Sequence, residues 1–226
     1  MTFSDVLRAI TGVGLAYRGT VQLRNDVSCE GLTASSVALV GFIGDQGWDA
    51  FTASKEWSEG GTDVLDRWTH RVLKSVAEDV GALPLFPFDG PPWWPFQKWA
   101  LKAEALFPSP IGILIHPEWG LWHSWRGALA FQEPLEAPVA TAGVSPCEGC
   151  DAKPCLTACP AYAITAAGYD ATKCLGFLDA IEDESCMAVG CMARHACPVG
   201  IEYRYRSERV IFHMNSFRRG QWRSKV

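Results

Sequence analysis

The chain has 226 residues, of which 48% are hydrophobic and 20% are charged, and its net charge is −5. This length accommodates one large domain or two modest ones, and the apolar content is sufficient for a packed core. No apolar run approaches the length that spans a bilayer, and the first residues lack the pattern of a signal peptide. We therefore expect a cytoplasmic protein with no membrane partner.

Hydrophobic periodicity predicts both helices and strands before the middle of the chain. Apolar residues at helical spacing predict helices over residues 2–17, 46–53, 62–80 and 96–106. Thr62 is expected to cap the start of the third helix and Gly81 its end. Buried strands are expected at 35–44 and 82–86, and a hairpin is expected from 111–115 and 121–131. These elements predict an α/β domain over residues 1–140.

The rest of the chain is predicted to form a linker, a second domain and a C-terminal helix. Residues 134–143 are the expected linker, and residues 141–201 are the expected second domain, with a strand starting at 163–165. Residues 202–226 contain seven basic and two acidic side chains, which predicts a basic helix or tail. We interpret it as a solvated helix with one face docked on the body, and contact with nucleic acid or an acidic partner is the alternative. The expected fold class is α+β.

The strongest chemical signal is a dense group of cysteines. Eight of the nine cysteines lie between Cys147 and Cys197, in two runs that each end in Cys-Pro. The first run has the spacing C-x2-C-x4-C-x3-C-P, and the second follows the isolated Cys174. Since four thiolates hold one [4Fe–4S] cluster, eight predict two clusters. Zinc sites typically use well-separated CxxC pairs, and cytosolic chains rarely keep structural disulfides, so both are less favoured.

The spacing also predicts which cysteines belong together. In bacterial ferredoxins the fourth cysteine of each run binds the other cluster. The same crossing assigns one cluster to Cys147, Cys150, Cys155 and Cys197. It assigns the second cluster to Cys159, Cys174, Cys186 and Cys191. Arg194 and His195 lie between the last two cysteines and are candidates to donate hydrogen bonds to cluster sulfur, with solvation at the surface as the alternative. Cys29 stands alone, and we interpret it as a small buried hydrophobic residue.

Part of the cysteine region resembles a known family. The run from Cys147 to Pro160, the Ala-Ile-Thr after it, Cys174 before Leu-Gly-Phe-Leu, and the closing Cys197-Pro198 resemble the iron–sulfur domain of epoxyqueuosine reductases. These are cobalamin-dependent reductases related to the reductive dehalogenases. The resemblance implies a bacterial-ferredoxin-like domain with two clusters. It also implies a preceding α/β domain similar to the nitroreductase-like cobalamin carriers, and hence cobalamin as a further cofactor.

A second candidate site is a segment rich in tryptophan and histidine. A cofactor pocket combines aromatic walls with a few convergent polar groups. This mixture predicts a cofactor site at His116, Trp122, His123, Trp125 and Arg126. The alternative is core tryptophans with surface histidines. No catalytic residue can be named from the sequence.

Three functions remain open. We favour an electron-transfer protein that carries two [4Fe–4S] clusters and exchanges electrons with a redox partner protein. The first alternative is a corrinoid-dependent reductase of the epoxyqueuosine reductase kind. The second is a noncatalytic binding module whose clusters are structural. A nucleic acid ranks below a redox protein as the expected partner.

Overall fold

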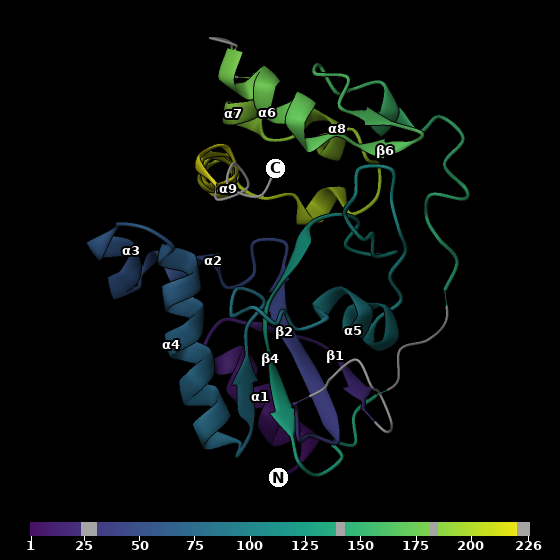
Figure 1. The fold of residues 1–226 in the computed structure, drawn as a ribbon. Helices are drawn as coiled ribbons and strands as arrows, with labels where there is room; N and C mark the ends of the chain where they lie inside the picture. Colours follow the sequence, from purple (N-terminus) through teal and green to yellow (C-terminus); the bar gives the residue numbers. More distant parts are fainter. Residues whose placement is uncertain (24–30, 139–142, 181–184, 221–226) are drawn as a thin grey trace. The chain divides into compact units, whose positions relative to one another are not determined.

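The structure is a computed structural model that describes residues 1–23, 31–138, 143–180 and 185–220. The chain mixes helices with sheet, as the expected α+β class requires (Figure 1). It divides into two compact units, the first formed by Met1–Ala105 with His123–Gly143 and the second by Leu106–Trp122 with Val144–Val226. The segment Leu106–Trp122 lies within the predicted 1–140 domain but belongs to the cysteine-bearing unit. Cys29 and part of the predicted linker lie outside the described residues.

The first unit is built on a four-stranded antiparallel sheet of order β1-β2-β4-β3. Its strands are β1 (Ala16–Gln22), β2 (Ser36–Ile43), β3 (Leu83–Leu85) and β4 (His123–Phe131). Strand β2 is central and is buried on both faces, which its continuous apolar sequence requires. Gly41 is needed where β2 and β4 change register, because a Cβ there would lie 1.9 Å from the Ser124 carbonyl oxygen.

Five helices of the first unit are described beside this sheet (Figure 1). They are α1 (Phe3–Gly12), α2 (Trp48–Thr52), α3 (Lys55–Glu59), α4 (Val64–Asp79) and α5 (Phe96–Ala103). Helix α4 packs on β3 and β4, and α5 packs on β1 and β2. The close fit of α5 is seen at Gly19, where a Cβ would lie 2.4 Å from the Ala103 carbonyl oxygen.

Two sequence predictions fail at helix starts and ends. The helix predicted over 2–17 ends at Gly12, and Gly14 then turns the chain into β1 with a φ of 82°. Thr62 does not cap α4, because the helix begins after Asp63, and Asp63 makes no side-chain capping hydrogen bond. The predicted end at Gly81 is confirmed by its left-handed φ of 64°.

The predicted hairpin is also wrong. Strand β4 pairs with β2 and β3 and does not pair with residues 111–115. Ile115 instead bridges to Phe107, and His116 bridges to Gly120. The apolar side chains of Ile111 and Ile115 are buried in the core of the second unit, which explains their hydrophobic pattern.

The pH dependence of stability should reflect one ion pair of the first unit. Arg71 donates two hydrogen bonds to the buried Glu56 carboxylate, at 2.6 and 2.9 Å, and thereby lowers the pKa of Glu56 from about 4.5 to about 2. Because the pKa is lowered in the folded state, the stabilisation is present above about pH 4.5 and is lost as the pH falls toward about 2. Solvent screens the half-exposed Arg71, so we expect about 1–2 kcal/mol.

Glu56→Gln tests this expectation through urea unfolding at several pH values. The variant should be less stable than the parent at pH 7, and the two should converge near pH 2–3. An equal difference at both pH values would show that the carboxylate charge contributes nothing.

The second unit combines helices with a two-stranded sheet. Its elements are η2 (Pro154–Leu156), β5 (Ile164–Thr165), β6 (Gly168–Tyr169), α6 (Ala171–Ala180), α7 (Ser185–Val189), α8 (Met192–His195), η3 (Ile201–Tyr203) and α9 (Ser207–Arg219). Strand β5 confirms the strand predicted after the first Cys-Pro. Helix α9 falls within the predicted basic helix and packs on α7 and α6. In the described residues, no helix is long and apolar enough to cross a bilayer.

Candidate metal centre

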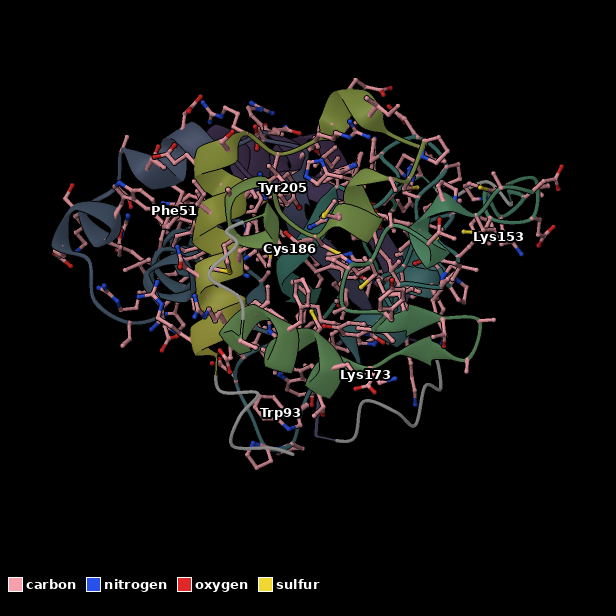
Figure 2. The ribbon with its side chains drawn as sticks, turned by 90° about the horizontal axis from the view of Figure 1, so that it is seen from above. Phe51, Trp93, Lys153, Lys173, Cys186 and Tyr205 are labelled. Atoms are coloured by element: carbon pink, nitrogen blue, oxygen red, sulfur yellow. The ribbon has the colours of Figure 1, made fainter. Side chains whose placement is uncertain are left out.

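The second unit carries all eight cysteines that the structure describes, and each of them is a free thiol. Six of them pack with one apolar core: Cys147, Cys155, Cys159, Cys174, Cys191 and Cys197. The same core contains Ile111, Leu121 and Ile164. Cys186, on α7, is also buried (Figure 2). The thiols are therefore partly or fully shielded from water, as redox cofactors in proteins commonly are.

The charges of the thiolates act on one another within a first group of four. The pKa of the Cys147 thiol is raised mainly by burial and further by Cys197, Cys155 and Cys150. Burial likewise raises the pKa of Cys155, and Cys197 and Cys150 add to the effect. These are the four cysteines that the crossed assignment predicts for one cluster, and the assignment stays a prediction.

The other four thiols form a second group. Burial raises the pKa of Cys191, and Cys174, Cys186 and Cys159 raise it further. Burial also raises the pKa of Cys174, to which Cys159 and Cys186 contribute. These are the cysteines that the crossed assignment predicts for the second cluster.

Hydrogen-bond donors surround several of these sulfur atoms. Backbone N–H groups of Leu156, Arg194 and Val199 donate to Cys155, Cys191 and Cys197 respectively. Such donors stabilise a thiolate and are one of the means by which proteins tune iron–sulfur clusters.

Two side chains also donate to cysteine sulfurs. The Ser145 hydroxyl donates to Cys147, and the Tyr169 hydroxyl donates to Cys174. Burial, followed by this bond to Cys174, raises the pKa of Tyr169, so the phenol keeps its proton and acts as the donor. Neither residue was predicted, and nothing in the cysteine spacing points to them.

The chain reaches Cys155 through a tight turn. Lys153 has a left-handed φ of 37°, and Pro154 then starts η2, which contains Cys155. The Lys153 side chain is exposed at this turn, in Figure 2 well away from the labelled Cys186. The run has two residues more than the bacterial ferredoxin spacing between its second and third cysteines, and we place them at Lys153 and Pro154 or their neighbours. They form a surface turn directly before Cys155.

The arrangement differs from that of a mononuclear metal site. Among the described residues, no three His, Cys, Asp or Glu side chains converge closely enough to hold one ion. A four-iron cluster makes another demand, because each of its four thiolates binds a different iron atom. The assignment of the eight thiols to two clusters stays a prediction.

The predicted cofactor pocket is divided between the two units. His116 and Trp122 belong to the second unit, and His123, Trp125 and Arg126 belong to the first. His116 stacks on Trp119 at 3.8 Å between ring centroids and accepts backbone hydrogen bonds at Nδ1. Trp122 is buried edge-on against His195 and Tyr205. Both therefore have well-defined structural neighbours.

The other three residues make contacts inside the first unit. His123 is buried, with Nδ1 3.1 Å from Arg18, and its ring meets Trp125 edge-on. Arg126 forms an ion pair with Asp66. The alternative placed the histidines at the surface, and it is wrong for His123, which is buried. A cofactor pocket formed by the five residues stays a prediction.

Comparison with known proteins finds a similar fold but does not identify a family for the chain. No protein-family model and no curated protein sequence matches the chain. Its structure is similar to a crystal structure of epoxyqueuosine reductase with a tRNA-Tyr epoxyqueuosine-modified stem-loop, with a TM-score of 0.52 and 14% sequence identity. The similarity covers 92% of this chain and 68% of the reductase chain. It therefore extends beyond the cysteine region, to which the sequence resemblance was limited.

Proposed function

We propose that this chain is an iron–sulfur redox protein that carries two [4Fe–4S] clusters in a bacterial-ferredoxin-like domain. One cluster is held by Cys147, Cys150, Cys155 and Cys197, and the other by Cys159, Cys174, Cys186 and Cys191. The observation that carries the proposal is that the eight described cysteines are free thiols of one unit and that six of them pack with one apolar core. The donors at the sulfur atoms and the surrounding apolar core support it.

The protein's own residues supply binding and control. When bound, the clusters supply one-electron transfer. The Cys-Pro turns present Cys159 and Cys197 at the ends of their runs, and the N–H and O–H donors stabilise the thiolates. Leu121, Ile164 and their neighbours exclude water. Cysteines assigned to both clusters pack with one core, so an electron can pass between the clusters on its way from a donor protein to an acceptor.

Anaerobic reconstitution with iron and sulfide tests the redox role. After reduction with dithionite, the protein should show the EPR signals of reduced [4Fe–4S] clusters and should lose visible absorbance. Clusters that bind but stay silent to dithionite would contradict electron transfer and would favour the structural alternative.

A second candidate function is favoured by the extent of the fold similarity. The shared fold spans most of this chain, including its first unit, and the neighbour was solved with a tRNA stem-loop. This supports a reductase that binds a corrinoid through a first domain of the nitroreductase-like carrier type and acts on an RNA nucleoside. RNA then becomes a candidate partner of the same rank as a redox protein, whereas the sequence alone ranked nucleic acid below it.

Titration of the reconstituted protein with cobalamin separates the two candidates. A stoichiometric change in the corrinoid spectrum, together with binding of a tRNA stem-loop in a gel-shift assay, supports the reductase. If neither ligand binds, the reductase is excluded and the electron carrier remains.

A further inference from the structure

Two arginines in the second unit have unusual surroundings. The Arg194 guanidinium lies over the rings of Trp122 and Tyr205, at 4.4 and 4.7 Å from their centroids, and donates to the Leu121 carbonyl oxygen. The Arg204 guanidinium donates to the His195 carbonyl oxygen. Both are half-buried, and neither has a carboxylate partner in the part of the chain that the structure describes.

A half-buried cation without a counter-ion is unfavourable, because the desolvation that it suffers is not repaid. The Nε atoms of both arginines and Nε2 of His195 are buried, and within the described residues they have no hydrogen-bond partner. Buried polar atoms are nearly always satisfied, so the two arginine Nε–H donors require an acceptor, and Nε2 of His195 a partner, that the described residues do not supply.

Each arginine lies beside a cysteine of a different group. The Arg204 guanidinium bonds to the carbonyl oxygen of His195, which is two residues before Cys197 of the first group. Arg194 donates its backbone N–H to Cys191 of the second group. Its side chain and Cys191 both line a small cavity of about 50 Å³. A [4Fe–4S] cluster with four thiolates carries net negative charge, which increases on reduction, and thus provides the missing counter-ion.

We infer that Arg204 and Arg194 are the counter-charges of the two clusters, each raising the reduction potential of the cluster beside it. Arg204 acts on the cluster at Cys197, and Arg194 acts on the cluster at Cys191. This inference rests on the proposed function. A fixed positive charge favours the state with the extra electron, and the effect decreases with distance, so the two arginines act on different clusters.

Charge-removing variants test the inference in the full, reconstituted chain. EPR-monitored redox titration of Arg204→Gln should show that one midpoint potential becomes more negative. Arg194→Gln should lower the other one. Arg204→Lys and Arg194→Lys keep the charge and should stay close to the parent. Arg219→Gln is the matched control, because it removes an exposed arginine from α9 without touching either site.

The outcomes distinguish failure of the inference from failure of the proposed function. Loss of one cluster in a glutamine variant, with retention in the lysine variant, also supports the counter-charge role. Unchanged potentials in both glutamine variants, at parental iron and sulfide content, overturn the inference and leave the clusters in place. A parent chain that binds no iron and sulfide overturns the proposed function and the inference with it.

Discussion

Replacing Cys155 or Cys197 by alanine should disturb the same iron–sulfur cluster, although 42 positions separate them in the sequence. Both belong to the first group of thiols. Burial is the main cause of the raised pKa of Cys147, and the charges of Cys197 and Cys155 raise it further. A cluster that loses one of its four ligands should lose iron, so the content should fall from about eight atoms per chain toward about four. The same EPR signal should change in both variants.

The complementary pair is Cys159→Ala and Cys174→Ala, which should disturb the other signal. Cys29→Ala is the matched control, since that cysteine lies outside both runs, and it should keep the full iron content. Uncrossed ligation gives the opposite pattern, with Cys159→Ala changing the same signal as Cys155→Ala. That pattern would refute the crossed assignment while leaving the cluster count intact.

Replacing Glu104 by glutamine should strongly destabilise the first unit. Arg18 is fully buried, and its Nε and Nη2 atoms donate to the two oxygens of Glu104 at 2.6 and 2.8 Å. The pair joins β1 to the residue that follows α5. Removing one partner of a buried ion pair leaves the other charge uncompensated, which typically costs about 3–5 kcal/mol.

Urea unfolding followed by circular dichroism measures this loss. Glu133→Gln is the control, because this exposed carboxylate lies in the same unit, and its removal should cost less than about 0.5 kcal/mol. The double variant Arg18→Met with Glu104→Leu should recover part of the stability, since it removes both charges. A loss below about 1 kcal/mol in Glu104→Gln would show that the pair is not a main stabiliser of the unit.

The sequence predicted those elements whose apolar pattern is local and complete. Strand β2 follows from a continuous apolar run, and α4 follows from apolar residues at helical spacing. Strand β1 was missed because residues 2–17 continue an apolar pattern through Gly14, and only pairing with β2 decides that Ala16 is in a strand. Tertiary pairing, which local pattern does not contain, determined the outcome there.

In the candidate site, too, only the features that a local sequence pattern contains were predicted. The cysteine spacing alone predicted two sets of four, because ligand geometry restricts the order of ligands in the chain. The residues that act on the ligands could not be predicted in this way, because they stand at no fixed spacing from the cysteines. They are the hydrogen-bond donors Ser145 and Tyr169 and the charged Arg204. The burial of Arg18 on β1 could not be predicted from hydrophobic periodicity either, because its partner Glu104 is distant in the sequence.

Iron and acid-labile sulfide content of the anaerobically reconstituted full chain tests the central claim most directly. Two [4Fe–4S] clusters require about eight iron atoms and about eight sulfides per chain. About four of each would show that only one group of cysteines holds a cluster, and iron without sulfide, or neither, would contradict the account altogether.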